Sequence, residues 1–161
     1  MALIVHKYGG TSMGSAERIR NVAKRVAKWA RAGHQMVVVP SAMSGETNRL
    51  LGLASELAPA HAGQSYYREL DMLASTGEQA SSALLAIALQ AEGMPSVSYA
   101  GWQVPVRTDS SYTKARIESI DDKRVRADLD AGRVVIVTGF QGIDDQGNIT
   151  TLGRGGSDTS A

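Results

Sequence analysis

Residues 2–15 decide the fold, and they read ALIVHKYGGTSMGS. The apolar run at 2–5 predicts a buried β-strand. Two glycines and two hydroxyl residues follow it, and a helical pattern begins after Gly14. A strand that enters a helix through a glycine-rich turn points backbone N–H groups into one concavity, which suits phosphate oxygens. Lys7 could place an ammonium over the same spot, so the stretch favours a site for phosphoryl transfer.

Two well-known phosphate-binding loops do not match this turn. A Walker A loop needs lysine directly after its second glycine, where this chain has Ser15 after Gly14, and the Rossmann pattern G-x-G-x-x-G is absent. Taken alone, the glycine pair is explained more simply as a tight turn.

A strand–helix–strand unit extends from this turn. Ser15 can cap a helix whose apolar residues recur at helical spacing until Gly33. The opposite face of that helix is basic, which we interpret as a solvated surface. Residues 36–39 predict a second buried strand, closed by Pro40, so the first forty residues predict a βαβ unit with parallel strands.

The polar loop SAMSGETN follows at residues 41–48. It lies at the carboxyl end of a strand, which is the edge where open α/β sheets bind ligands. An ordinary connection, in which Thr47 or Asn48 caps a helix at 50–57, explains it equally well.

Two helices, at 66–73 and 77–91, are predicted next, separated by Ser75-Thr76-Gly77. Glu78 would then stand at the N-terminal end of the second helix, where a carboxylate is a common partner of the helix dipole.

Short elements fill the rest of the chain up to a second glycine-rich loop. The pattern predicts strands at 96–100, 104–108, 115–120 and 133–137, a helix at 121–129 and a β-hairpin at 143–152. The last residues, 153–161, read GRGGSDTSA, and Ser157 or Asp158 could cap a following helix. Because the sequence stops where that helix would begin, we expect it to be a fragment of a longer chain.

Composition excludes several classes of protein. The 161 residues suffice for one domain with a core, and 43% hydrophobic and 20% charged residues are ordinary for a globular protein. A net charge of +1 gives no field that favours nucleic acid, and no apolar run is long enough to span a membrane. Cysteine is absent and the three histidines lack ligand spacing, so we expect no metal site of the protein's own and a cytoplasmic location.

Several of these loops together resemble the aspartate kinases of the amino-acid-kinase superfamily. Five motifs carry the resemblance, in the order of the family: KYGGTS (7–12), SAMSGETN (41–48), LASTGE (73–78), TGFQG (138–142) and TLGRGGSD (151–158). The resemblance implies an α/β fold, a three-layer α/β/α sandwich with a mainly parallel sheet. It also implies that residues 1–161 are the aspartate-binding, N-terminal part of a catalytic domain. The nucleotide-binding remainder and the regulatory ACT domains would then be absent.

The implied reaction transfers the γ-phosphoryl group of ATP, with Mg²⁺ bound through the nucleotide, to the side-chain carboxylate of L-aspartate. By similarity, Lys7 and Asp158 would be catalytic, Lys7 stabilising the phosphoryl group and Asp158 orienting Lys7. The phosphates would lie against Lys7, Gly9, Gly10, Ser12 and Ser41. The residues implied to bind aspartate are Thr47, Glu78, Arg154, Gly155, Gly156 and Ser157. Arg154 would hold the α-carboxylate bidentately, and Glu78 would attract the α-ammonium.

Two alternatives stay open. The chain could belong to another enzyme of the superfamily, of the acetylglutamate kinase or uridylate kinase type, or it could be a non-catalytic fragment that folds or associates. We expect the isolated fragment to have little or no kinase activity, and the full-length enzyme to be a homo-oligomer that binds neither nucleic acid nor membranes.

Overall fold

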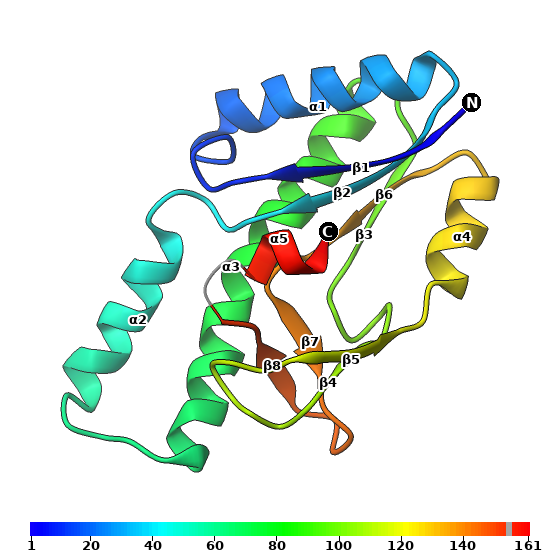
Figure 1. The fold of residues 1–161 in the computed structure, drawn as a ribbon. Helices are drawn as coiled ribbons and strands as arrows, with labels where there is room; N and C mark the ends of the chain where they lie inside the picture. Colours follow the sequence, from blue (N-terminus) through cyan, green and yellow to red (C-terminus); the bar gives the residue numbers. More distant parts are fainter. Residues whose placement is uncertain (154–155) are drawn as a thin grey trace.

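The predicted βαβ unit opens the fold (Figure 1). The computed structural model describes residues 1–153 and 156–161, apart from the side chain of Ser157. Strand β1 (Leu3–Tyr8), helix α1 (Ala16–Arg31) and strand β2 (Gln35–Pro40) follow one another, and β1 pairs with β2 in parallel. The hydroxyl of Ser15 accepts a hydrogen bond from the backbone N–H of Arg18 at 3.2 Å, which confirms the predicted helix cap.

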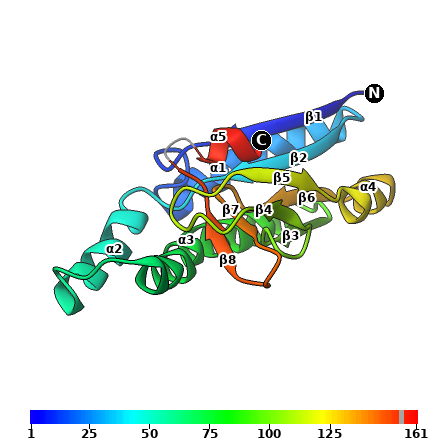
Figure 2. The same ribbon diagram turned by 60° about the horizontal axis from the view of Figure 1, so that its bottom comes forward.

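The main sheet is parallel, in the order β1-β2-β6-β3. Strands β3 (Ser96–Tyr99) and β6 (Val134–Val137) lie within the predicted ranges. Helices α1 and α3 (Gln64–Ala91) cover one face, where the core gathers. Its larger members are Tyr8, Met13, Ile19, Val22, Val26, Met36, Val38, Leu85, Leu89, Val134 and Ile136. The short helix α5 (Gly156–Ser160) lies against β2 on the opposite face (Figure 2), so helices flank the sheet as predicted.

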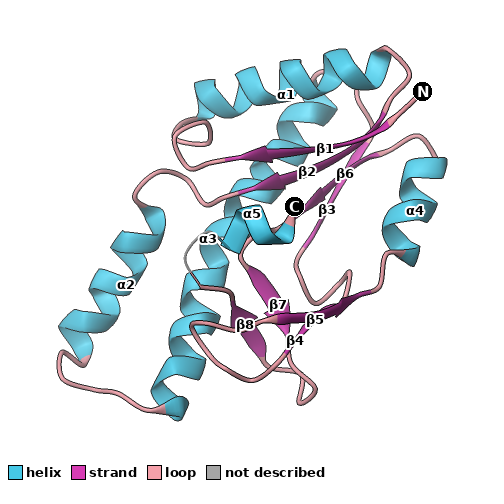
Figure 3. Ribbon diagram, in the orientation of Figure 1, coloured by secondary structure: helices cyan, strands magenta, loops and turns pink. Residues whose placement is uncertain are grey.

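A second, mixed sheet packs below the first, in the order β5-β4-β7-β8 (Figure 3). Its strands are β4 (Val106–Thr108), β5 (Ile117–Ile120), β7 (Gln141–Ile143) and β8 (Ile149–Thr151), and helix α4 (Lys123–Asp130) leads from β5 to β6. The pairing of β7 with β8 is antiparallel, which confirms the predicted hairpin.

Two predictions about helices are wrong. Residues 64–91 form the single helix α3, without the break predicted at 75–77. The hydroxyls of Ser75 and Thr76 donate back to the carbonyls of Met72 and Leu73, at 2.9 and 2.7 Å, so they are satisfied inside the helix. Gly77 serves close packing, because a Cβ atom there would lie 2.9 Å from the Cβ of Ala42.

The second wrong prediction concerns the start of the preceding helix. Helix α2 (Glu46–Leu57) begins at Glu46, so Thr47 and Asn48 lie in its first turn and do not cap it. Gly45 is the cap residue, in the left-handed conformation at φ 79°, and it offers no side chain to the free N–H groups of the helix.

Candidate functional site

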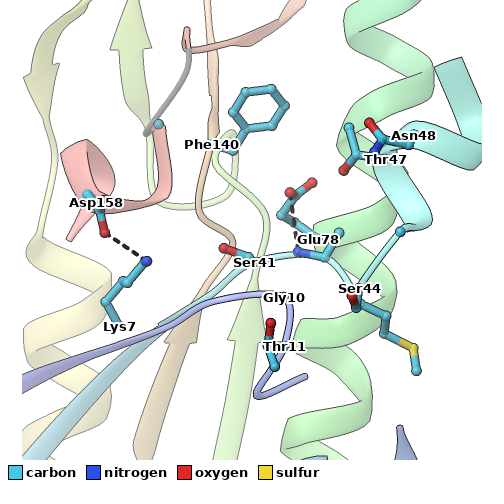
Figure 4. Close-up of a pocket in the computed structure, with 14 residues that line it drawn as sticks. Lys7, Gly10, Thr11, Ser41, Ser44, Thr47, Asn48, Glu78, Phe140 and Asp158 are labelled. Carbon is cyan, nitrogen blue, oxygen red and sulfur yellow. Dashed lines mark hydrogen bonds and ion pairs between the residues drawn. The ribbon is translucent and has the colours of Figure 1, made fainter. Parts of the chain in front are cut away.

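Lys7 and Asp158 meet on one face of the main sheet, the face that carries α5. Successive side chains of a strand point to opposite faces, and Tyr8 belongs to the core on the side of α1. Lys7 therefore points to the side of α5, where its Nζ lies 2.9 Å from Oδ1 of Asp158 (Figure 4). The Asp158 side chain is 70% exposed. A pair this exposed contributes at most about 1 kcal/mol to stability.

Glu78 is buried at the opposite side of the same hollow (Figure 4). Its Oε1 accepts a hydrogen bond from the backbone N–H of Ala42 at 3.3 Å, while its Oε2 has no hydrogen-bond partner among the described residues. Burial raises the pKa of Glu78 to about 7, although the bond from Ala42 opposes that shift. Because Glu78 lies in the middle of α3, the helix dipole does not account for its position.

The loop after β2 forms the floor between these two ends. The hydroxyl of Ser81 donates to the carbonyl of Ser41 at 2.7 Å, and Gly77 lets Ala42 approach α3 closely. Ser41 and Thr47 both line the hollow. The loop is thus fastened to α3, and it presents hydroxyl groups and the uncapped start of α2 to the space above it.

The glycine turn forms the adjoining wall, but only in part. Gly10 lines the hollow, and a Cβ atom there would lie 3.2 Å from the carbonyl oxygen of Ala42. Gly9 lies beside Lys7, whose Nζ would be 3.8 Å from a Cβ at that glycine. Ser12 borders a separate, smaller hollow and is not among the residues that line this one.

Phe140 and Gly156 form another wall of the hollow. Phe140 has a left-handed backbone, at φ 73°, and its carbonyl accepts from the N–H of Leu152 at 2.7 Å. Its own N–H donates to Oγ of Ser160 at 3.0 Å, which ties it to α5. A Cβ atom at Gly156 would lie 2.8 Å from the Phe140 ring and 2.9 Å from the Leu152 Cβ, so only glycine fits there.

Some lining residues were not among the predicted site residues. They are Thr11, Ala42, Met43, Ser44, Gly45, Asn48 and Phe140. All but Phe140 lie within the first two quoted motifs, and Phe140 lies within TGFQG, so the motifs were a signal for the region though not for single side chains. The predicted residues Arg154 and Gly155, and the side chain of Ser157, lie outside the described part of the chain.

The hollow has a volume of about 410 Å³, within the range of small-molecule sites. It has a cation at one end, a buried carboxylate at the other and hydroxyl groups between them. This arrangement complements a small molecule that carries both an ammonium and an anionic group.

Comparison with known proteins assigns the chain to a family. Residues 2–161 match the amino acid kinase family. The chain belongs to that family. It is 62% identical to an aspartate kinase of Pseudomonas fluorescens and 61% identical to an aspartokinase of Pseudomonas aeruginosa, in each case over 99% of this chain. It spans 38% of the length of each of these relatives.

Solved structures agree with this assignment. The crystal structure of aspartate kinase from Synechocystis has 46% identity and a TM-score of 0.78, over 99% of this chain and 25% of that one. Escherichia coli aspartokinase III in complex with aspartate and ADP has 24% identity and a TM-score of 0.83, over 97% of this chain and 44% of that one. At that identity the second likeness shows the fold alone.

The described residues offer neither a membrane span nor a metal cluster. None of their helices is long and apolar enough to cross a membrane. Within residues 1–153 and 156–161, no group of three or more histidine, cysteine or acidic side chains is arranged to hold a metal ion.

Proposed function

We propose that the protein is the aspartate-binding part of an aspartate kinase, which transfers the γ-phosphoryl group of ATP to the side-chain carboxylate of L-aspartate. The product would be 4-phospho-L-aspartate, the first intermediate towards lysine, threonine and methionine. The observation that carries the proposal is the buried Glu78, whose Oε2 lacks a partner among the described residues and which lines a hollow with Lys7 at its other side. The names of the relatives at 61–62% identity support it independently.

The proposed orientation of aspartate follows from charge. Its α-ammonium would donate a hydrogen bond to Oε2 of Glu78. Because that oxygen is already shielded from water in the free protein, binding would not have to remove water from it. Its side-chain carboxylate would point towards Lys7. By the family resemblance, Arg154 would hold the α-carboxylate and Thr47 would contact the bound amino acid.

The chemical step needs positioning and charge stabilisation more than acid–base catalysis. An oxygen of the aspartate side chain attacks the γ-phosphorus, the bond from that phosphorus to the β,γ-bridging oxygen breaks, and ADP leaves with the electron pair. The attacking carboxylate is already ionised, so no proton has to be removed. Lys7 would stabilise the charge on the transferred group, Asp158 would keep its ammonium in place, and the backbone at Gly10 would approach the phosphates.

The nucleotide would bring Mg²⁺ with it, and that ion would neutralise phosphate charge during the transfer. The described residues fit this arrangement, because they offer the phosphates a lysine and a glycine turn. We propose that the rest of the nucleotide site lies in a part of the full-length protein outside residues 1–161. We also propose that the full-length protein is a homo-oligomer located in the cytoplasm.

An assay of ATP-dependent aspartyl hydroxamate formation tests the function in the full-length protein. We expect turnover with L-aspartate, and little or none with N-acetylglutamate or uridylate as phosphoryl acceptors. Lys7→Ala should abolish most of kcat while aspartate binding largely survives. Turnover of another acceptor in place of aspartate would refute the proposal. Residues 1–161 alone should show little or no activity, because binding with half of the cleft walls would leave the ordering cost of the ligand uncompensated.

A further inference from the structure

A second buried carboxylate, Asp71, lies in α3 and only 1% of its surface is exposed. Its oxygens accept hydrogen bonds from the N–H of Thr113 at 3.0 and 3.1 Å and from the N–H of Thr151 at 2.9 Å. The hydroxyl of Thr151 donates to it as well, at 2.6 Å. Asp71 is thus bonded to two segments that are far from it in sequence.

The segment of Thr151 adjoins the wall of the hollow, because Leu152 lies against Gly156. Thr151 ends β8, and the chain continues from there through Leu152 towards α5, which carries Asp158. Thr113 has a left-handed backbone, at φ 71°, a conformation that costs free energy and persists only where the surrounding structure holds it. The N–H of Ala115 donates to the carbonyl of Thr151 at 3.0 Å, so both segments form one unit fastened to Asp71.

Asp71 and Glu78 are fixed relative to each other by helix geometry. They are seven residues apart in an unbroken helix, which places them on the same face about two turns, or roughly 10 Å, from one another. A further bond, from Nε2 of Gln141 to the carbonyl of Ser75 at 3.0 Å, fastens β7 to the helix between them. Helix α3 therefore carries the buried acid of the hollow and also the anchor of the opposite wall.

We infer that Asp71 is a positioning residue. It sets where β8 ends and where Leu152 lies against Gly156, and thereby the distance from Glu78 to α5, which bears Asp158. The inference rests on the proposed function, in which Glu78 binds the α-ammonium of aspartate and Asp158 keeps Lys7 in place near the side-chain carboxylate at the other end. A wall displaced by even about 1 Å would weaken aspartate binding while the rest of the fold stays intact.

Asp144 provides a matched control. It is 2% exposed, and it accepts hydrogen bonds from the hydroxyls of Ser110 and Tyr112 and from the N–H groups of Gln146 and Asn148. Asp144 is as buried and as fully bonded as Asp71, but it holds the turn at the far end of the same hairpin. If Asp71 only stabilised the fold, its replacement should affect aspartate binding as little as the replacement of Asp144 does.

The test compares Asp71→Asn with Asp144→Asn in the full-length protein, well below the melting temperature of either. Both oxygens of Asp71 accept hydrogen bonds, whereas the side-chain amide in Asp71→Asn has one oxygen and one N–H₂ group. The N–H₂ group would face N–H donors of Thr113 or Thr151, so at least one hydrogen bond would be lost. We expect Asp71→Asn to raise the aspartate KM at least tenfold and to speed hydrogen exchange at the Leu152 amide. Asp144→Asn should leave the KM within twofold. Thr151→Ser, which keeps the hydroxyl, should keep the wild-type KM, whereas Thr151→Val should share the Asp71→Asn defect.

The outcomes separate the inference from the proposed function. Equal KM values for Asp71→Asn and Asp144→Asn, with an active wild type, would overturn the positioning role. A wild type that does not phosphorylate aspartate would overturn the proposed function, while exchange at Leu152 would still show whether Asp71 holds the wall. Should Asp71→Asn fail to fold, Thr151→Val against Thr151→Ser decides the same question.

Discussion

At the scale of single residues, ligand binding in the proposed site depends on whether the Glu78 carboxyl group is protonated. Glu78 has a pKa of about 7 because its carboxylate is shielded from water and receives a single hydrogen bond from another residue of the described chain, Ala42. An ammonium bound at Oε2 would favour the charged form. In the proposed complex, binding of aspartate below pH 7 is therefore coupled to loss of a proton from Glu78.

This coupling gives a prediction for the pH dependence of binding. Aspartate affinity should rise as the pH increases from about 5.5 to 7, by up to about tenfold per unit, and should level off above that. Glu78→Gln should weaken binding by about 1–3 kcal/mol and flatten the profile. Calorimetric titration of the full-length protein with aspartate at several pH values measures both. Glu69→Gln, an exposed site on the same helix, is the control, and a Glu78→Gln profile as steep as that of the wild type would contradict the assignment.

At the scale of elements, α3 shows why local sequence patterns mispredict this region. Serine, threonine and glycine in succession are typical of a helix break, and the pattern holds no information about their partners. The partners are a loop about 35 residues upstream, at Ala42, and the hairpin more than 60 residues downstream, at Gln141. Strand and helix periodicity was sufficient to predict the βαβ unit around Lys7, because its elements follow each other directly in the sequence. The contacts of Asp71 and Gly77, by contrast, are set by tertiary packing alone.

Two glycines in helices test this explanation. A methyl group added at Gly52 in α2 would have no atom within 4 Å beyond its chain neighbours and the backbone of its own helix, so Gly52→Ala should stabilise the protein by about 0.4–1 kcal/mol. Gly77→Ala has the same intrinsic gain, but its methyl group would meet Ala42 at 2.9 Å and push the 41–45 loop away. We expect no gain in melting temperature and a higher aspartate KM. If both variants stabilise equally and Gly77→Ala keeps the KM, close packing is not the reason for that glycine.

At the scale of the whole molecule, the sequence predicted the parallel βαβ unit and the hairpin, because each has a local period or turn. The mainly parallel sheet with helices on both faces was implied by the family resemblance. The sequence did not predict that β4 and β5 join the hairpin in a second sheet, since β4 pairs in parallel with β7 through residues 36 positions apart, Arg107 and Ile143. The sequence motifs indicated which loops would form the site. They did not indicate that Glu78 would be almost wholly buried there. Burial of that kind depends on both sheets being in place.

The buried acid also affects global stability. In the folded protein Glu78 keeps its proton up to about pH 7, whereas an unfolded chain releases it near 4.5. The unfolded state thus binds fewer protons between these values, and the free energy of unfolding should fall as the pH rises through that window, by up to roughly 3 kcal/mol. Asp144 has a lowered pKa and acts in the opposite direction, but below about pH 4.

Chemical denaturation between about pH 5 and 8 measures this contribution. The stability of the wild type relative to Glu78→Gln should decline across the range, because the variant has no proton to release at that position. A constant difference would show that the Glu78 carboxyl is more hydrated than the structure implies.

The thin attachment of α2 has a consequence for any ligand. Leu50 is the buried residue of this helix, and Leu53 and Leu57 are largely exposed, so little apolar contact opposes its local opening. Thr47 and Asn48 stand on this loosely held helix, whereas Lys7 and Glu78 stand on the sheet and on α3. A molecule that reaches Thr47 gives up part of its affinity to immobilise α2, and one that stops at Lys7 and Glu78 does not. We therefore expect small ligands confined to the side of Lys7 and Glu78 to match the affinity of larger ones.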